Sequence, residues 1–369
     1  MDPIPAENEA YLSQQLITYI GNKRSLLPFI GEALGKVKKR LGREKLKILD
    51  AFSGSGAAAR YFKAHAELLL VNDLEAYSET INRCYLANTE ELPVKELREI
   101  HGALLRRLKG EPLRKGFIAE LYAPDDENDI QPGERVFYTP RNAMFIDTAR
   151  QYIEEIDPGL KPFFIAPLLS EASIHANTAG VFKGFYKDRL TGKGRFGGTA
   201  RDALSRIKGG IDLPFPVWSN FNCPVEIHRE DANKLVSDLE ETDLAYLDPP
   251  YNQHPYGSNY FMLNLILSYK RPGGLSRVSG IPPDWNRSVY NIRREAARAF
   301  LDLAGKIRSK FLLVSFNSEG FISPGDMRAM LEKTGKLEIF EKPYNTFRGS
   351  RNLRERHTHV KEYLFLVEK

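Results

Sequence analysis

The stretch Lys45-Leu-Lys-Ile-Leu-Asp50-Ala-Phe-Ser-Gly-Ser-Gly56 carries the pattern that decides the fold. A short apolar run that ends in a carboxylate predicts a strand, and the glycines directly after it predict a tight turn. The small residues of 57–62 then predict a helix. Glycines let the backbone approach a ligand closely, and the free amides of a helix start attract negative groups. Strand, glycine turn and helix therefore predict an open α/β sheet that binds a nucleotide-like ligand.

The next apolar run, Leu68–Val71, ends in Asn72 and Asp73. A second parallel strand would present such an acid to the hydroxyls of a ribose. Two ligand classes fit this pattern: the dinucleotide of a dehydrogenase and S-adenosylmethionine. Asp50 would repel a nearby pyrophosphate but suits the ammonium group of methionine, so the pattern favours the methyl donor.

A third apolar run leads into Leu244-Ala-Tyr-Leu-Asp248-Pro-Pro-Tyr251. The carboxyl ends of parallel strands share one edge of a sheet, so we expect Asp248 to lie beside Asp50 and Asp73. The amine of a nucleic-acid base is a weak nucleophile, because its lone pair is delocalised into the ring. If Asp248 and the Pro249 carbonyl accepted its two hydrogens, the lone pair would face an electrophile, and Tyr251 could stack on the base. This motif predicts methyl transfer to a base amine.

The segment from residue 90 to residue 223 departs from the alternation of strands and helices. We predict an inserted domain there, between a first catalytic part (1–89) and a second one (224–369). Within it, 187–208 carries seven basic and two acidic residues, interleaved with glycines. Such a loop suits contact with phosphates, although a solvated surface loop would look the same. Near the end of the chain, 288–307 predicts a helix, 311–318 a strand, and 337–340 with 363–367 a hairpin.

Composition limits the class of protein. The chain has 369 residues, of which 42% are hydrophobic and 27% charged, and this predicts at least one large core. The net charge of +5 permits a polyanionic partner but would also suit proteins that never bind nucleic acid. No apolar run reaches the roughly 18 residues of a membrane span. Cys84 and Cys223 are not spaced as zinc ligands. We expect a cytoplasmic protein without a metal.

Taken together and in this order, the motifs resemble those of the α-group DNA adenine-N6 methyltransferases, which include the Dam methylase and the methylases of type II and type IIS restriction-modification systems. The matching segments are Tyr19-Ile-Gly-Asn-Lys23, Asp50-Ala-Phe-Ser-Gly-Ser-Gly56, Asn72-Asp73, Glu230-Asp231-Ala232 and Asp248-Pro-Pro-Tyr251. The resemblance implies a Rossmann-like, S-adenosylmethionine-dependent methyltransferase sheet with helices on both faces. It also implies an inserted, mainly helical target-recognition domain at 90–223.

The resemblance assigns roles to particular residues. It implies a catalytic motif made of Asp248, Pro249, Pro250 and Tyr251. It implies donor contacts from Tyr19, Lys23, Asp50, Phe52, Ser53, Gly54, Gly56, Asp73, Asp231 and Ala232. Position and charge predict DNA contacts for Lys193, Arg195, Arg201, Tyr256, Asn259, Arg348 and Arg351.

The expected partner is double-stranded DNA in the prokaryotic nucleoid, and a cognate restriction endonuclease is a candidate second partner. Three alternatives stay open: an amino-methyltransferase on RNA or on cytosine N4, a non-catalytic DNA-binding homologue, and a dehydrogenase that binds NAD. The intact Asp248–Tyr251 motif argues against a decayed enzyme.

Overall fold

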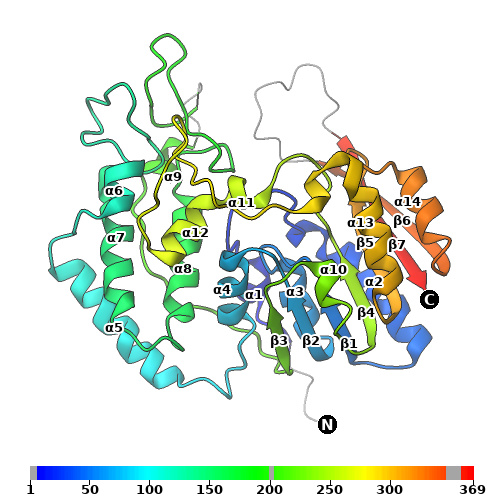
Figure 1. Ribbon diagram of the computed structural model, residues 1–369. Helices are drawn as coiled ribbons and strands as arrows, with labels where there is room; N and C mark the ends of the chain where they lie inside the picture. Colours follow the sequence, from blue (N-terminus) through cyan, green and yellow to red (C-terminus); the bar gives the residue numbers. More distant parts are fainter. Residues whose placement is uncertain (1–5, 199–202, 346–358) are drawn as a thin grey trace.

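The computed structural model describes residues 6–198, 203–345 and 359–369 (Figure 1). Its centre is a seven-stranded sheet in the order β3-β2-β1-β4-β5-β7-β6. The strands are β1 (Leu46–Asp50), β2 (Ala66–Asn72), β3 (Val225–His228), β4 (Thr242–Leu247), β5 (Ser309–Asn317), β6 (Lys336–Asn345) and β7 (His359–Glu368). The five strands from β3 to β5 pair in parallel, and β7 runs antiparallel between β5 and β6. The carboxyl ends of the parallel strands therefore meet at one edge.

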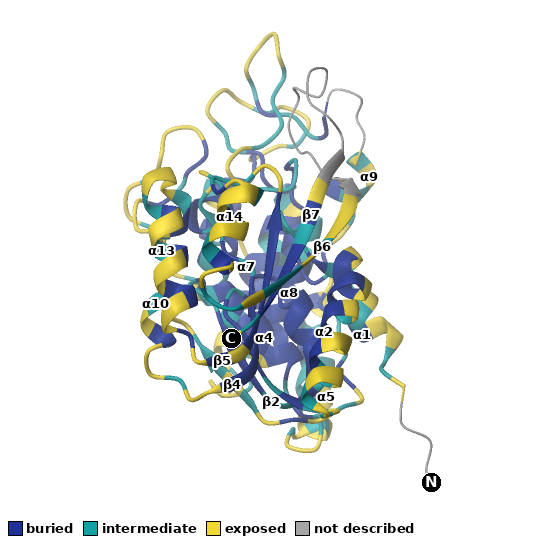
Figure 2. Cartoon of the chain, turned by 90° about the vertical axis from the view of Figure 1, so that its right-hand side faces the viewer, coloured by how far each residue is buried: buried dark blue, intermediate teal, exposed yellow. Residues whose placement is uncertain are grey.

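Helices cover both faces of the sheet. One face packs against α2 (Leu27–Leu41) and α3 (Ala57–Lys63), and the other against α10 (Ala232–Leu235), α13 (Arg293–Lys306) and α14 (Pro324–Leu331). Alternate strand residues supply the two layers, because side chains along a strand point to opposite faces. In β1, Ile48 packs toward α2 and Leu49 toward α13. Figure 2 shows the strands buried between exposed helix surfaces. The predicted α/β class with helices on both faces is confirmed.

A body of helices lies beside the sheet (Figure 1). It contains α5 (Val94–Gly110), α6 (Phe117–Tyr122), α7 (Pro140–Glu154), α8 (Pro162–Ile174) and α9 (Leu204–Lys208) from the predicted insert. Elements from outside 90–223 share the same hydrophobic core: α1 (Glu9–Ser13), α4 (Ala76–Tyr85) and α12 (Phe261–Ser268). The buried guanidinium of Arg150 on α7 donates to the carbonyls of Ile266 and Leu267, which ties the insert to the chain beyond the Asp248 motif.

The segment expected to form one helix over 288–307 differs from that expectation. A 3₁₀ turn, η2 (Val289–Asn291), comes first, and α13 begins only at Arg293. The Ser288 side chain accepts a hydrogen bond from the Tyr290 amide, and Ile292 has an extended backbone, so the helix cannot start earlier. The turn leaves Tyr290 free to face the site described below. The hairpin predicted at the end of the chain is confirmed by the antiparallel pairing of β6 with β7.

Candidate active site

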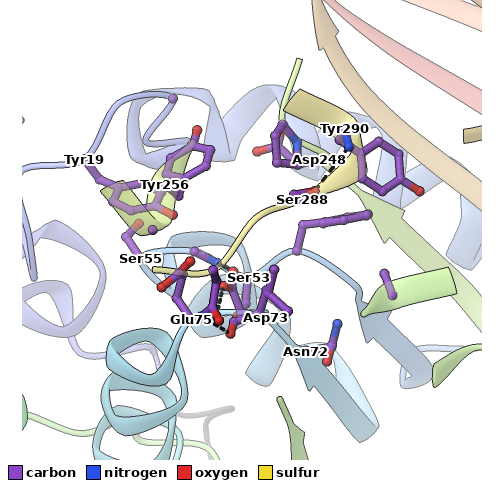
Figure 3. A pocket seen from close by; sticks show the side chains of 18 of the residues that line it. Tyr19, Ser53, Ser55, Asn72, Asp73, Glu75, Asp248, Tyr256, Ser288 and Tyr290 are labelled. Atoms are coloured by element: carbon purple, nitrogen blue, oxygen red, sulfur yellow. Dashed lines mark hydrogen bonds between the residues drawn. The ribbon is translucent and has the colours of Figure 1, made fainter. Parts of the chain in front are cut away.

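A pocket of about 890 Å³, measured to its open mouth, lies where β1, β2 and β4 end. This volume is within the usual range for a site that takes a small organic ligand. Eleven of the predicted site residues line it: Tyr19, Lys23, Phe52, Ser53, Gly54, Asp73, Asp231, Ala232, Asp248, Pro250 and Tyr256. Parallel pairing explains the convergence, since each strand delivers the residues after it to the same edge. Figure 3 shows these side chains around a common space.

The glycine turn after β1 has the backbone shape that only glycine adopts readily. Gly54 and Gly56 have φ angles of +52° and +75°. A Cβ atom on Gly54 would lie 2.8 Å from the Tyr19 ring, and one on Gly56 would lie 2.8 Å from Oδ1 of Asn82. Gly54 therefore forms the pocket wall together with Tyr19, whereas Gly56 allows α4 to approach and does not line the pocket.

Asp73 connects the segments that follow β1 and β2 through hydrogen bonds. Its Oδ2 atom accepts a hydrogen bond of 2.7 Å from the Gly54 amide, and its Oδ1 atom accepts one of 2.9 Å from the Glu75 amide. Burial raises the pKa of Asp73 to about 6, although these amides favour the charged form. Each oxygen thus accepts one backbone hydrogen bond, and Asp73 also lines the pocket.

Glu75 was missed by the sequence analysis, and it lines the same pocket two residues further on. Its Oε2 atom accepts a 2.8 Å hydrogen bond from the Asn264 side chain on α12. Burial raises the pKa of Glu75 to about 7. Figure 3 shows Glu75 beside Asp73. A signal existed in the sequence, because a second acid follows Asp73 at the end of the same strand, but its direction could not be read there.

Asp50 lies beneath the turn and does not line the pocket. Its side chain is fully buried, and neither oxygen forms a hydrogen bond of normal geometry, although the amides of Phe52 and Ala59 lie near enough to favour the charge. Burial, followed by repulsion from Asp248, raises the pKa of Asp50 well above its usual range. Asp50 and Asp248 are thus electrostatically coupled across neighbouring strands β1 and β4.

Asp248 forms an ion pair with Lys23. Nζ of Lys23 lies 3.2 Å from Oδ1 of Asp248 and 3.9 Å from Oε2 of Glu362 on β7. Burial lowers the pKa of Lys23, but the two carboxylates outweigh it and raise that pKa well above its usual range. Burial raises the pKa of Asp248 to about 6, with Lys23 opposing the shift. The site at neutral pH therefore holds a charged carboxylate next to a charged amine. Glu362 had no signal in the sequence.

Tyr251 lies behind Asp248 rather than in the pocket wall. Its ring meets Phe316 edge-on with a centroid distance of 5.9 Å, and its carbonyl accepts a 2.8 Å hydrogen bond from the Phe321 amide. Burial raises the pKa of Tyr251 to about 12, so its hydroxyl stays protonated at physiological pH. Pro249 is also absent from the pocket lining. The structure thus places both residues outside the pocket wall, next in the chain to Asp248 and Pro250, which do line it.

Three tyrosine rings stack on one another, and two of them line the pocket. The Tyr19 ring lies 4.9 Å from that of Tyr256 and 4.7 Å from that of Tyr260. The Tyr256 hydroxyl donates to the Ile20 carbonyl, and the Ile20 amide donates to the Tyr260 hydroxyl. Tyr256, which begins α11 (Tyr256–Asn259), faces the pocket, and Asn259 is buried within the fold. The stack fixes the segment that carries Lys23.

Another part of the pocket wall carries two aromatic rings. Phe52 meets Tyr290 edge-on with a centroid distance of 5.3 Å, and Ala232 also lines the pocket. The Tyr290 hydroxyl donates to Oδ1 of Asn233, and Asp231 caps α10 by accepting from the Asn233 amide. Tyr290 is a second residue that the sequence analysis missed, since it stood inside a predicted helix.

Among the other predicted DNA contacts, Lys193 and Arg195 do not line the pocket. Lys193 and Arg195 are on a loop of the helical body, and the Arg195 guanidinium donates to the carbonyls of Gly197 and Gly198. Arg201, Arg348 and Arg351 lie outside the described residues. Among the residues that the structure describes, no group of three or more His, Cys, Asp or Glu side chains could hold a metal ion. Within the same residues, no helix is long and apolar enough to cross a bilayer.

Comparison with known proteins gives consistent matches over most of the chain. The family model described as D12 class N6 adenine-specific DNA methyltransferase matches residues 19–330. The type II methyltransferase M.NlaIII of Neisseria lactamica is 30% identical over 363 residues, which cover 96% of this chain and 99% of that protein.

Two further relatives extend this comparison. The type II methyltransferase M.CviAII of Paramecium bursaria Chlorella virus 1 is 29% identical, with 95% of this chain and 98% of that protein covered. The type II methyltransferase M.FokI of Planomicrobium okeanokoites is 26% identical over 95% of this chain but over only 52% of its own length. The chain thus matches M.NlaIII and M.CviAII over nearly their whole length, and M.FokI over about half of its length.

Proposed function

Because the chain belongs to the D12 class of N6 adenine-specific DNA methyltransferases, we propose that it uses S-adenosylmethionine to methylate N6 of an adenine turned out of double-stranded DNA. The observation that carries this proposal is the single pocket that is lined both by the aromatic rings of Phe52 and Tyr290 and by the Asp248 carboxylate. A methyl donor with an adenosine moiety at one end and a reactive methyl at the other fits such a pocket.

The residues present fit this donor in three parts. Phe52, Ala232 and Tyr290 would hold its adenine ring, with Asp231 at the rim. Glu75, which lines the pocket beside Asp73, would accept hydrogen bonds from the ribose hydroxyls. Asp73 would support this contact by holding the Gly54 turn in place.

The methionine end would lie toward Tyr19, Lys23 and Ser53. The buried Asp50 would act indirectly, since it lies beneath the turn and does not line the pocket. The donor supplies an activated methyl group and needs no metal.

Asp248 would hold the target amine. Its carboxylate and the Pro249 carbonyl each accept one hydrogen of the adenine N6 amine, which aims the nitrogen lone pair at the methyl group. Lys23 keeps Asp248 ionised, since burial alone favours the neutral acid. Tyr251, with its ring steadied by Phe316, offers a stacking surface for the displaced base.

The biological setting follows from the relatives. M.NlaIII and M.CviAII are named type II methyltransferases, so we propose that this enzyme modifies DNA in a restriction-modification system with a cognate endonuclease as partner. Its place would be the cytoplasm, at the nucleoid.

The direct test supplies the purified protein with radiolabelled S-adenosylmethionine and either duplex DNA or RNA, followed by nucleoside analysis. N6-methyladenine in DNA is the expected product. Label in N4-methylcytosine or only in RNA would overturn the proposal, and no label at all would favour a non-catalytic homologue. Long-read sequencing of DNA from cells that express the protein then reports the sequence around each methylated adenine.

A further inference from the structure

Glu362 is a buried acid to which the chemistry described so far gives no role. It lies on β7 with 4% of its surface exposed, opposite Asn317 of β5 in the sheet. Its Oε2 atom has no hydrogen-bond partner among the described residues. A buried carboxylate oxygen without a hydrogen bond is costly, so its presence calls for a physical reason.

Glu362 shares one cation with the Asp248 carboxylate. Nζ of Lys23 lies 3.9 Å from Oε2 of Glu362 and 3.2 Å from Oδ1 of Asp248. The side chains of Lys23 and Glu362 are buried, and Asp248 is open only toward the pocket that it lines. One ammonium group therefore faces two carboxylates, which leaves one negative charge unbalanced.

The other titratable groups around Asp248 supply no second positive charge. Asp50, on the neighbouring strand β1, is an acid and repels it. The remaining neighbours are phenols whose pKa values are raised by burial, so they are neutral at physiological pH: Tyr246 on β4, Tyr251 and Tyr256. Lys23 is the only basic residue in the described part of the chain that lines the pocket. Glu362 and Asp248 thus compete for the same cation.

Methylation of a base amine releases a proton that must be accepted. The lone pair of N6 attacks the methyl carbon, and the carbon–sulfur bond breaks with its electrons left on sulfur. The nitrogen then carries a positive charge, and it becomes neutral when one hydrogen leaves as a proton and the N–H electrons return to nitrogen. Asp248 would already accept a hydrogen bond from this amine, whereas the protonated Lys23 has no lone pair for the proton.

A carboxylate beside an ammonium group is a weak base, because the positive charge favours its ionised form. Lys23 alone would therefore keep Asp248 ionised but would make it a poor acceptor of a proton. A second carboxylate at the same ammonium group opposes this effect, since like charges favour protonation. Burial is the largest cause that raises the pKa of Asp248 to about 6, and the charge of Glu362 raises it too, against the effect of Lys23.

We propose that Glu362 is a positioning residue that acts through Lys23: it shares the ammonium group and so leaves Asp248 basic enough to take the proton that N6 releases. Asp248 remains the group that contacts the target amine. This inference rests on the proposed function and deepens it, because it assigns the fate of the released proton and a role to a second acid.

The test compares Glu362→Gln with the wild-type protein in single-turnover methylation across the acidic and neutral range, at saturating donor and DNA. We expect the pH of half-maximal rate, near 6 in the wild type, to fall by roughly one unit in the variant. The plateau at higher pH should fall by about 2-fold to 10-fold, because Asp248 becomes a weaker base. A loss of structure alone would lower the rate without moving the midpoint to lower pH.

Carbon NMR of protein labelled at the aspartate carboxyl carbons gives a second readout without donor or DNA. The Asp248 signal is assigned by its loss in Asp248→Asn, and its pKa should be lower in Glu362→Gln than in the wild type. Glu362→Asp keeps the charge on a shorter side chain and should lower the pKa of Asp248 by less. This variant carries the test if Glu362→Gln does not fold.

Glu341→Gln is the matched control, since Glu341 lies on β6 of the same hairpin, where it is 57% exposed and pairs with Lys361. It removes the same charge without touching Lys23, and it should change neither the midpoint nor the plateau. A midpoint in Glu362→Gln that is unchanged or higher, or a plateau equal to that of the wild type, would overturn the role of Glu362 and leave adenine methylation intact. If the wild type produced no N6-methyladenine on any DNA, the proposed function itself would fail.

Discussion

At the scale of single residues, the catalytic end of the pocket is organised by charge. Asp248, Lys23 and Glu362 come from three distant parts of the chain. Nζ of Lys23 lies 3.2 Å from the Asp248 carboxylate and 3.9 Å from that of Glu362. Buried charges are stable only when they are paired. Lys23 therefore balances the charge of Asp248, and we propose that it also lies near the methionine end of the donor.

Replacing Asp248 by alanine tests the role of the carboxylate. We expect methyl transfer to fall by roughly 100-fold to 10,000-fold, because the target amine loses an acceptor that orients it. Donor binding should change far less, since other lining residues, among them Glu75 and Ala232, are proposed to hold the adenosine part of the donor. Single-turnover rates and donor titration by calorimetry measure the two effects. Asp248→Asn keeps the shape and should also be slow.

The control for this variant lies on the same strand. Asp243 stands at the opposite end of β4, where it binds Lys310 and Arg43. Asp243→Asn should lower stability without slowing transfer in the folded protein. An equal loss of donor binding and activity in Asp248→Ala would contradict a role that is confined to the target base.

The pH dependence follows from the raised pKa of Asp248. Burial places this pKa at about 6, so the carboxylate is ionised above pH 6 and takes up a proton below it. The active form is the ionised one, and transfer should therefore fall by nearly tenfold per pH unit below pH 6 and reach a plateau above it. The measurement needs saturating donor, because Glu75, with a pKa of about 7, would weaken donor binding as it is protonated. A rate that rose toward low pH would contradict this sign.

At the scale of elements, the turn between β1 and α3 forms one wall of the donor pocket. Gly54→Ala would place a methyl group 2.8 Å from the Tyr19 ring in a backbone conformation with a φ of +52°. We expect donor affinity to drop and the protein to lose on the order of 1–3 kcal/mol of folding stability. Thermal unfolding with and without donor separates the two effects.

Gly35→Ala on α2 is the matched control for this change. Nothing lies within 4 Å of the added atom, and the residue is helical, so the substitution should stabilise the protein by roughly 0.5–1 kcal/mol. Unchanged donor affinity in Gly54→Ala would show that the turn has room that the structure does not indicate.

At the scale of the whole molecule, the sheet and the helical body together form the site. The sheet supplies the Asp248 motif, and α12 supplies Asn264, which holds Glu75. The hairpin at residues 185–197 of the helical body stands on the side where the parallel strands end (Figure 1). The pocket and this hairpin thus belong to one connected structure.

Removing charge from the hairpin tests its contact with DNA at this scale. For the double variant Arg189→Gln with Lys193→Gln, we expect weaker binding to every DNA sequence and a salt dependence whose logarithmic slope is smaller by about 2. Phosphate contacts release counterions without reading sequence, which is the physical reason. Fluorescence anisotropy at several salt concentrations measures the slope.

Lys39→Gln, exposed on α2, serves as the control and should leave the slope unchanged. A change in preferred sequence without a change in slope would count against phosphate contact.

Local patterns in the sequence predicted a large part of this architecture. The apolar runs at β1, β2 and β4 and the glycine turn after β1 are short-range signals, so the α/β sheet and the pocket edge followed from them. The break between η2 and α13 did not follow, because a capping hydrogen bond from the Ser288 side chain outweighs helical periodicity there. For this reason the sequence placed Tyr290 inside a helix and did not identify it as a pocket residue.

The sequence by itself determined the order of the strands along the chain, the glycine turn and the Asp248–Tyr251 motif, since each depends on neighbouring residues. Only the tertiary structure decided which groups meet across the fold. It engaged both oxygens of Asp73 in backbone hydrogen bonds, brought Glu75 to the pocket and set Lys23 between Asp248 and Glu362. These contacts join residues far apart in the chain, and their geometry depends on sheet order and burial, which no local pattern encodes.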